Sequence, residues 1–396
     1  GLGKTAVMAA SLVALALGAA LPRRLVYVVD RRAVVDQATA VAESLCAWVA
    51  KERGVADALG LDDRPLPIST LRGQHVDNRA WLEDPSSPAI VVGTVDMVGS
   101  RLLFSGYGVS LKMRPYHAGL LGADTLVVLD EAHLVPAFED LIRQVEREAD
   151  RFGPNEPSLR GLVPEFKLLS LSATGRQTDA TTLTLSDDDR RDPIVKKRLT
   201  AKKALSIVNL IDAADATATP ADGKRADDAD EATKKNKGPK LTDILAKQAW
   251  EVTRQGLAQV RCLVFCDARK DATAVADELR NLAKSNGVKE PPVELFVGGR
   301  RVKERTQGRD ALARLGFLAG TAVNLERSAF LIATSAGEVG VDLDADHMVC
   351  DLVAWERMVQ RLGRVNRRGD GDAKVVVVVN REPAPATAKA QEALDE

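Results

Sequence analysis

The chain has 396 residues, of which 55 are Lys or Arg and 56 are Asp or Glu, so its formal net charge is −1. A chain of this length holds roughly two to three domains, and 45% hydrophobic residues are enough to build their cores. A charge so close to zero excludes a protein that binds nucleic acid with its whole surface, so any such contact is local.

The chain opens with Gly1-Leu2-Gly3-Lys4-Thr5, which matches the end of the phosphate-binding loop G-x-x-x-x-G-K-[ST]. In this loop the backbone N–H groups surround phosphates, which places Gly1 and Gly3 at a nucleotide such as ATP. Lys4 would reach the β- and γ-phosphates, and the Thr5 hydroxyl would bind Mg²⁺. Because the motif begins before Gly1, we expect the chain to be a fragment of a longer protein.

The uncharged run of residues 6–21 allows two other interpretations of this segment. It resembles the apolar part of a secretory signal peptide, which also follows a basic residue. It fits an ordinary buried helix as well, whereas it is too short and too rich in Ala to span a membrane. No later apolar run reaches membrane length, so we expect no membrane partner. Motifs further along the chain favour the phosphate loop.

Short apolar runs alternate with longer helical patterns along the chain, and their lengths are typical of buried parallel strands. The predicted strands occupy residues 26–29, 90–92, 125–129, 168–171, 261–265, 293–296, 329–333, 348–352 and 375–379. Helical patterns such as residues 33–51 and 138–151 lie between them. The alternation predicts an α/β fold with doubly wound parallel sheets in two tandem domains.

Residues 212–240 contain no Leu, Ile, Val or Phe and are crowded with Ala, Asp and Lys. Such a stretch cannot bury a core, which is typical of a flexible linker or a surface insertion. We therefore expect a first domain at residues 1–205, a linker or insertion at residues 206–240, and a second domain at residues 241–396.

The predicted strand at residues 125–129 ends in two adjacent carboxylates, Asp130 and Glu131, followed by Ala132 and His133. Ligands of open α/β sheets bind at the carboxyl ends of strands. We expect Asp130 to hold Mg²⁺ and Glu131 to polarise the attacking water as general base. An acidic helix cap after a strand would explain the pattern equally well if it stood alone.

Three polar residues are expected to couple this site to the opposite domain. His133 closes the carboxylate motif, and Ser172 and Thr174 follow the next predicted strand in the sequence Ser-Ala-Thr. Alone, the Ser-Ala-Thr sequence would be an ordinary small polar turn. We assign it the coupling role because it follows the phosphate loop and the carboxylate motif in the chain.

Arginines recur near the far end of the chain, within the segment Gln360-Arg361-Leu362-Gly363-Arg364-Val365-Asn366-Arg367-Arg368. Arg357, Arg361, Arg364 and Arg368 share one face at helical spacing, and no acid lies between the first and the last of them. Clustered like charges repel one another, so we expect an anion to bind there.

We expect Arg364 and Arg367 to stabilise charge on a phosphoryl group during its transfer, with Gln360 beside them as a further catalytic residue. Arg357 and Arg368 fit a basic face that touches a nucleic-acid backbone. Upstream, after the predicted strand at residues 329–333, Thr334 would bind a nucleic-acid phosphate and Asp342 the ribose of the nucleotide.

The ordered motifs GLGKT, LDEAH, LSAT, IATSAGEVGVD and QRLGRVNRR resemble those of a superfamily 2 helicase of the DEAH type. Within that superfamily, T-x-x-x-E-x-G-V-D followed by QRxGRxNRxG resembles the CRISPR-associated helicase of type I systems. Residues 26–37, 69–74 and 93–108 point the same way and look like the subtype often called I-U or I-G. The resemblance implies two RecA-like domains that form a helicase core, with ATP and Mg²⁺ as cofactors. It also implies nucleic-acid contacts at Arg31, Arg32, Thr70, Arg72, Thr94 and Thr334.

The function implied is an ATP-dependent DNA helicase or translocase that unwinds single-stranded or duplex DNA targets in type I CRISPR interference, an antiviral defence. We expect a cytoplasmic monomer that acts with a crRNA-guided surveillance complex. An RNA helicase or a restriction-system translocase would share the same motifs. A clamp that binds the nucleotide without hydrolysing it is a further alternative.

Members of this family usually carry an HD-type nuclease domain with a His-Asp metal centre. None of the 4 histidines of this chain is followed by Asp. We therefore expect the nuclease domain to lie outside this fragment or to be absent.

Overall fold

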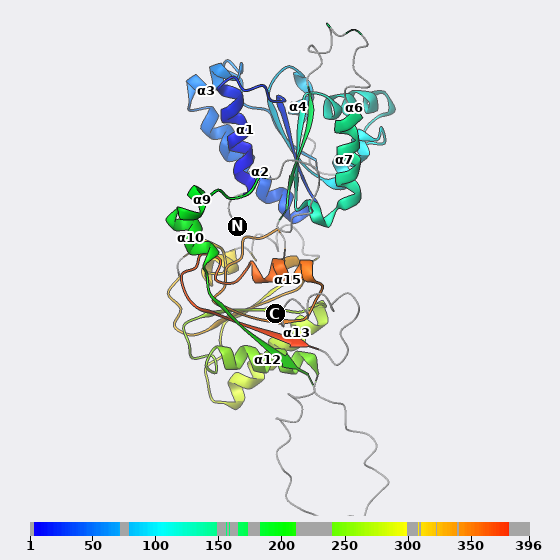
Figure 1. Ribbon diagram of the computed structural model, residues 1–396. Coiled ribbons are helices and arrows are strands. Elements are labelled where there is room, and N and C mark those ends of the chain that lie inside the picture. The colour runs from blue at the N-terminus through cyan, green and yellow to red at the C-terminus, as the bar shows by residue number, and fades with distance from the viewer. Residues whose placement is uncertain are drawn as a thin grey trace, which may run out of the picture. The chain divides into compact units, whose positions relative to one another are not determined.

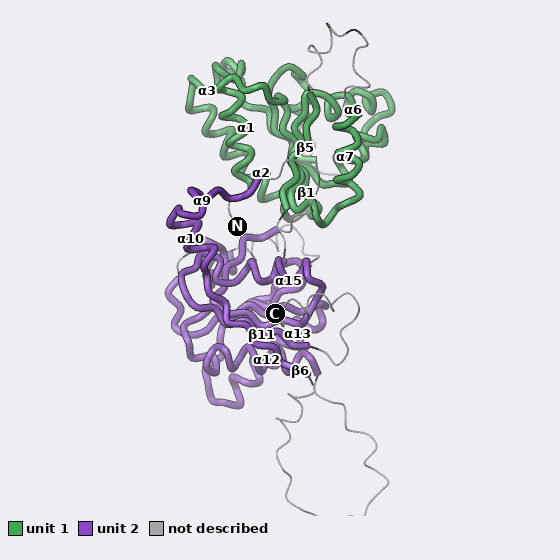
Figure 2. Tube along the Cα trace, viewed as in Figure 1, with its two compact units in different colours: residues 1–181 green, residues 182–396 purple. Residues whose placement is uncertain are grey.

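The computed structural model describes residues 4–71, 79–148, 156, 158, 165–172, 183–210, 240–298, 308, 310–321, 323–338 and 340–379 (Figure 1). The chain divides into two compact units, unit 1 at residues 1–181 and unit 2 at residues 182–396 (Figure 2). Four predicted site residues lie outside the described residues, namely Gly1, Gly3, Arg72 and Thr174. Only the backbone of Arg32 is described.

Unit 1 contains a five-stranded parallel sheet with the strand order β2-β3-β1-β4-β5. Its strands are β1 (Arg24–Val29), β2 (Ile68–Leu71), β3 (Ala89–Thr94), β4 (Thr125–Asp130) and β5 (Phe166–Leu171). All six residues of β1 and of β3 are buried, as expected for central strands of a sheet covered on both faces.

Helices cover both faces of this sheet (Figure 1). One face carries η1 (Lys4–Ala6), α1 (Val7–Ala16), α2 (Arg32–Val49) and α3 (Arg53–Ala58). The other carries α4 (Ala80–Glu83), α5 (Val95–Leu102), η2 (Leu111–Met113), α6 (Arg114–Gly122), η3 (Ala132–Leu134) and α7 (Pro136–Glu148). The uncharged run near the start of the chain forms α1, whose Met8 and Leu12 are 0% and 3% exposed in the core against β1.

Unit 2 contains a six-stranded parallel sheet with the strand order β6-β11-β10-β7-β9-β8. Its strands are β6 (Lys203–Asn209), β7 (Arg261–Phe265), β8 (Val293–Phe296), β9 (Ala329–Ala333), β10 (His347–Asp351) and β11 (Ala373–Val379). Two helices, α12 (Leu241–Val252) and α13 (Arg269–Ser285), cover one face, and α15 (Trp355–Leu362) lies on the other. The remaining elements are α9 (Asp187–Arg191), α10 (Pro193–Leu199) and η6 (Ser335–Gly337).

The two sheets confirm the predicted fold class of two tandem doubly wound parallel-sheet domains. Two strands, β2 and β6, were not predicted. The strand β6 lies at the sheet edge with five of its seven residues exposed, so its sequence lacks the apolar run that indicates a buried strand. Because β6 pairs along its whole length with β11, unit 2 begins well before the expected linker. In the part of the chain that the structure describes, no helix is both long and apolar enough to cross a membrane.

The close packing of η6 on β9 gives a test of this fold. A Cβ at Gly337 would lie 2.8 Å from the Cβ of Ala333 and 3.2 Å from Cε1 of Phe265. We expect Gly337→Ala to lower the free energy of unfolding by about 1–3 kcal/mol because of overpacking. The matched control is Gly119→Ala in α6, where a Cβ meets no atom within 4 Å. Urea denaturation that ranks Gly337→Ala as the more stable variant would contradict the packing.

Candidate functional site

The carboxyl end of β4 brings two acidic residues to a lysine from the start of the chain. The Nζ atom of Lys4 lies 2.7 Å from Oε1 of Glu131 and 3.6 Å from Oδ1 of Asp130. Lys4 lies in η1, directly before α1, and α1 packs on the sheet face next to β1 and β4. One ammonium therefore offsets the charge of two neighbouring carboxylates.

The turn after β4 is held in an uncommon conformation. Glu131 has φ 53° and ψ 46°, in the left-handed region that non-glycine residues rarely adopt. Such strain persists where the surrounding structure fixes it, and it clusters at functional sites. The turn points the Glu131 carboxylate toward Lys4 and toward His133, whose Nδ1 lies 3.5 Å from Oε2 of Glu131.

His133 connects this turn to the next strand of the sheet. Its Nδ1 lies 3.0 Å from the hydroxyl oxygen of Ser172, which follows β5. Two of the three predicted coupling residues are therefore in contact, and the third, Thr174, lies outside the described residues. The chain provides a path from Glu131 through His133 to the end of β5.

Tyr27 is a site residue that the sequence reasoning missed. It is fully buried on β1, and its hydroxyl donates a 2.9 Å hydrogen bond to Oδ2 of Asp130. Burial, with the charge of Asp130 beside it, raises the pKa of the Tyr27 phenol, so the hydroxyl stays protonated and donates. Tyr27 pairs with Val128, so Asp130 is its diagonal neighbour on the same face. A lone tyrosine in a run of Val was the only signal.

The residues at this site fit a magnesium ion. Mg²⁺ takes oxygen ligands, which the Asp130 carboxylate and the Thr5 hydroxyl can supply. The Oδ1 atom of Asp130 is buried and accepts no hydrogen bond from the described residues, with only the Lys4 ammonium 3.6 Å away. Burial raises the pKa of Asp130, while Lys4 lowers it, so a nearby cation favours the charged carboxylate.

In unit 2, Glu338 gathers three of the arginines near the end of the chain. Its carboxylate is 1% exposed and accepts hydrogen bonds from Arg357 at 2.9–3.2 Å and from Nε of Arg361 at 2.8 Å. Nε and Nη2 of Arg364 donate to the backbone carbonyl of Glu338 at 3.2 and 2.7 Å. The sequence reasoning missed Glu338, although it is the one acid between Arg327 and Asp342.

Arg361 is entirely buried and is held by a second acid. Its Nη1 donates to both the side chain and the backbone carbonyl of Asp351 at 2.8 Å, and its guanidinium lies 4.9 Å from the ring centre of Phe265. Burial alone lowers the pKa of Arg361, but Asp351 and Glu338 raise it by a larger amount. Arg361 therefore stays charged inside the fold.

The arginines of this predicted face lie beside acids, and the binding of an anion there stays a prediction. Arg357 also donates to Asp267 at 3.0 Å, and Arg368 lies 3.8 Å from Asp370. Asp267 and Glu338 lie far from Arg357 in the sequence, so helical spacing could not reveal them.

The two predicted phosphoryl-contacting arginines share one acidic partner. Nη1 of Arg367 forms an ion pair with Oδ1 of Asp342, and Nη1 of Arg364 lies 3.8 Å from the same atom. Asp342, expected at a ribose, therefore lies beside both guanidinium groups. Gln360 lies in α15 and is 9% exposed.

The predicted nucleic-acid contacts divide by location. Arg31, Thr70 and Thr94 come from the carboxyl ends of three adjacent strands, β1, β2 and β3, and Thr334 follows β9 in unit 2. The three threonines are only 6–7% exposed. The Thr94 hydroxyl caps α5 by accepting from the backbone N–H of Met97 at 3.4 Å. The Thr70 hydroxyl lies 3.1 Å from the hydroxyl of Thr39, so it too has a partner within the fold.

Comparison with known proteins agrees with this architecture. Residues 258–370 match the family model described as CRISPR-associated nuclease/helicase Cas3, C-terminal. The fold is similar to that of T. fusca Cas3 with AMPPNP, at a TM-score of 0.58 and 18% identity, over 98% of this chain and 44% of that chain. The chain has the fold of a superfamily 2 helicase core.

Two further solved structures have a similar fold. Helicase Lhr of Mycobacterium smegmatis, bound to ssDNA and AMP-PNP, matches with a TM-score of 0.53 and 17% identity, over 96% of this chain and 43% of that one. A variant of S. cerevisiae Dbp5, bound to RNA and ADP BeF3, matches with a TM-score of 0.51 and 16% identity, over 100% of this chain and 80% of that one. Sequence comparison with curated proteins finds no match.

These comparisons confirm the predicted tandem RecA-like fold and the resemblance to Cas3. The chain spans less than half the length of the Cas3 and Lhr chains it matches, at 44% and 43%. The assignment to subtype I-U or I-G stays a prediction.

The hydrogen bond between Tyr27 and Asp130 can be removed without changing the shape of the core. We expect Tyr27→Phe to lower the free energy of unfolding by about 1–3 kcal/mol, because Asp130 loses its buried donor. The control is Tyr107→Phe, whose side chain is 65% exposed and should cost little. Equal unfolding midpoints in urea for the two variants would show that the bond contributes nothing.

The Glu338 carboxylate should matter more to stability than any exposed acid nearby. Glu338→Gln keeps the side-chain shape but leaves Arg361 buried without one of its two carboxylates, so we expect a loss of about 3 kcal/mol. Glu356→Gln, an exposed position in α15, serves as the control. Thermal unfolding that shifts equally in both variants would refute the central role of Glu338.

Proposed function

We propose that this chain is the motor core of an ATP-dependent DNA helicase or translocase that unwinds target DNA in type I CRISPR interference. The observation that carries the proposal is the contact of Lys4 with Asp130 and Glu131 at the end of β4. A phosphate-loop lysine beside a strand-end acid pair is the arrangement that nucleotide hydrolysis needs. The match of residues 258–370 to a Cas3 family model supports the CRISPR role.

In this proposal Lys4 exchanges its carboxylate partners for the β- and γ-phosphates of ATP, beside the backbone amides of Gly1 and Gly3. Thr5 and Asp130 would hold Mg²⁺, which offsets charge on the phosphate oxygens. Glu131 accepts a proton from the attacking water while the water oxygen bonds to the γ-phosphorus. The bond between that phosphorus and the bridging oxygen breaks, and ADP leaves with the electron pair.

Arg364 and Arg367 supply positive charge to the γ-phosphoryl oxygens in the transition state, and Gln360 assists them. Both arginines lie beside Asp342. When Asp342 binds the ribose, it would therefore release both arginines at the same time. His133, Ser172 and Thr174 relay the state of the nucleotide site to the DNA site.

The DNA strand would run over the carboxyl ends of β1, β2 and β3 in unit 1 and past β9 in unit 2. Arg31, Arg32, Thr70, Arg72, Thr94 and Thr334 are the proposed contacts. Contacts of this kind bind phosphate and carry no sequence information, so a motor can use them at every step. We propose that a crRNA-guided surveillance complex selects the target and that the motor acts as a cytoplasmic monomer.

An RNA helicase is the second candidate. The structurally similar Dbp5 is bound to RNA, and this chain covers 80% of its length. Stimulation of ATP hydrolysis by each nucleic acid separates the two candidates, because a motor is stimulated by the strand on which it moves.

The decisive variant is Glu131→Gln in the full-length protein. We expect the kcat of ATP hydrolysis to fall about 10²–10⁴-fold, because the water loses its base, while ATP still binds. Glu165→Gln at an exposed position is the control. Single-stranded DNA should stimulate ATP hydrolysis by the parent protein. Stimulation by RNA alone would favour the RNA helicase, and ATP-dependent DNA binding unchanged by Glu131→Gln without any turnover in the parent would favour the clamp.

A further inference from the structure

The two proposed phosphoryl-contacting arginines lie in one segment, residues 362–371, which runs from the last residue of α15 toward β11. This arginine loop has a left-handed residue at its centre, Asn366, with φ 45°. Asparagine and glycine tolerate this conformation better than other residues. The backbone N–H of Asn366 donates to the carbonyl of Ala345 at 2.8 Å, and the residue is only 7% exposed.

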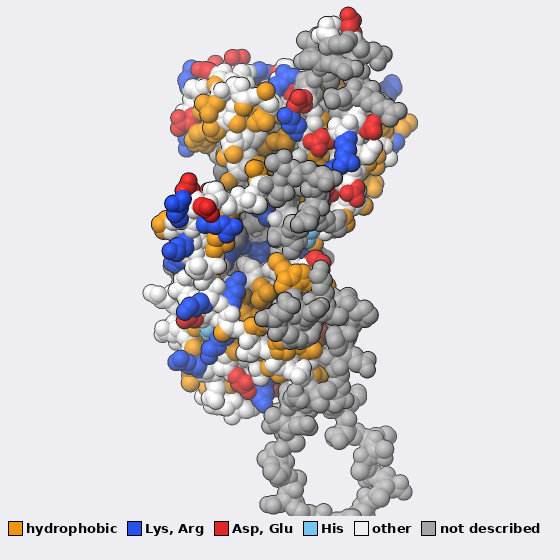
Figure 3. Space-filling model, viewed as in Figure 1, with side chains coloured by type: hydrophobic (Ala, Val, Ile, Leu, Met, Phe, Trp, Pro, Cys, Tyr) orange, Lys and Arg blue, Asp and Glu red, His pale blue; other side chains and the backbone are white. Residues whose placement is uncertain are grey.

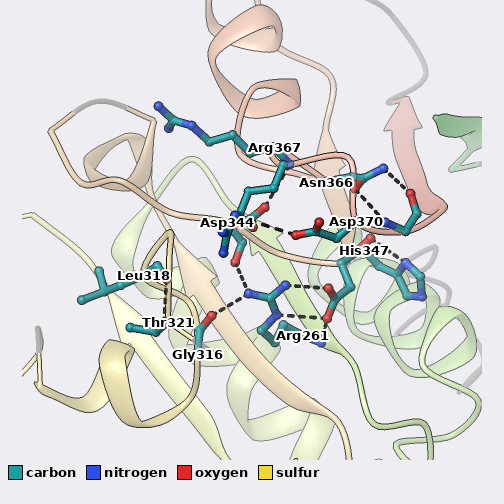
Figure 4. A network of polar contacts seen from close by, with 12 residues as sticks. Arg261, Gly316, Leu318, Thr321, Asp344, His347, Asn366, Arg367 and Asp370 are labelled. Carbon is teal, nitrogen blue, oxygen red and sulfur yellow. Dashed lines mark hydrogen bonds and ion pairs between the residues drawn. The ribbon is translucent and has the colours of Figure 1, made fainter. Parts of the chain in front are cut away.

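The side-chain amide of Asn366 holds the arginine loop at two places, and Figure 4 shows its hydrogen bonds within the loop. Its Nδ2 donates to the carbonyls of Lys202, at 3.0 Å, and of Gly371. Its Oδ1 accepts from the backbone N–H of Gly371 at 3.2 Å. One amide therefore closes the loop on itself and fastens it to the residue before β6.

Lys202 belongs to a short segment, residues 197–203, which makes three more contacts with the arginine loop. Nζ of Lys203 donates to the carbonyl of Leu362 at 2.8 Å, and Nζ of Lys197 lies 2.5 Å from Oδ1 of Asp370. The left-handed Gly369 packs so closely on the carbonyl of Lys197 that a Cβ would overlap it. Figure 3 shows Lys and Arg side chains gathered over α9 and α10, the helices that lead into this segment.

The inner side of the loop is fixed by a second network (Figure 4). The backbone N–H of Arg367 donates to Oδ1 of Asp344 at 3.0 Å, and Asp344 is 5% exposed. Nη1 of Arg261 donates to the carbonyl of Asp344 at 3.2 Å, while its Nε and Nη2 bind Asp346 at 3.0 and 2.6 Å. The backbone of Arg367 is therefore held by Asp344, which Arg261 of β7 binds, and by the hydrogen bonds of the neighbouring Asn366.

We propose that Asn366 and residues 197–203 are positioning elements that aim Arg364 and Arg367 at the phosphoryl group. This rests on the proposed role of the two arginines in ATP hydrolysis. Unit 2 begins at Thr182, so residues 197–203 lie near the point where the chain enters unit 2. A displacement of the entering chain is passed to the arginine loop through these bonds, which makes hydrolysis sensitive to movement of the connection.

Asn366→Gly tests the proposal in the full-length protein. Glycine keeps the left-handed backbone without strain but removes every side-chain tie. We expect kcat for ATP hydrolysis to fall about 10- to 100-fold through misplacement of the arginines, while KM for ATP changes little. Hydrogen exchange of the amides in residues 363–371 should become faster, and that of β10 should stay the same. Lys203→Met should act in the same direction with a smaller effect.

Lys196→Met, which removes a charge from α10 directly before Lys197, is the control and should leave kcat unchanged. Faster loop exchange with an unchanged kcat would show that the tie serves only the fold and would overturn the proposal. Unchanged hydrogen exchange of the loop amides in Asn366→Gly would overturn the proposal as well. A parent protein that hydrolyses no ATP would refute the proposed function, and the exchange of the loop would still decide whether Asn366 orders it.

Discussion

Burial of both faces of two parallel sheets is the constraint on which the other features depend. All six residues of β1 and of β3 are buried, and β9 is buried throughout. Strands of this kind leave room for polar chemistry only where they end. Asp130, Thr94 and Ser172 follow or close strands of unit 1, and Thr334 and Asp351 do so in unit 2. The position of these five residues at strand ends is a consequence of that burial.

The two units stabilise charge at these strand ends in different ways. In unit 1 a single ammonium, that of Lys4, serves two carboxylates, so the pairing can be exchanged when an anionic ligand competes for the lysine. In unit 2 Glu338 and Asp351 enclose Arg361 with short bonds on both sides of its guanidinium. Breaking a buried pair of that kind is costly. The pairing in unit 1 suits a site that exchanges its partners, and the pairing in unit 2 suits a structural scaffold.

The arginine loop is ordered by residues that lie outside the proposed phosphoryl contacts. Preorganised charge acts in a transition state without reorganisation, so this order would favour the proposed role of Arg364 and Arg367. Asp344 and Asn366 provide that order from opposite sides of the loop. The segment that enters unit 2 completes it, through the carbonyl of Lys202 and the side chain of Lys203.

The sequence by itself determined the fold class, nine of the strands and the order of the motifs, because buried strands and phosphate loops have local signatures. Only the tertiary structure decided which side chains meet. Tyr27 reaches Asp130 from a neighbouring strand, and Glu338 lies 23 residues before the buried Arg361 that it binds. The edge strand β6 was missed because its residues are mostly exposed and form no apolar run. Hydrophobic periodicity reports which face of an element is buried and carries no information about the partner that buries it.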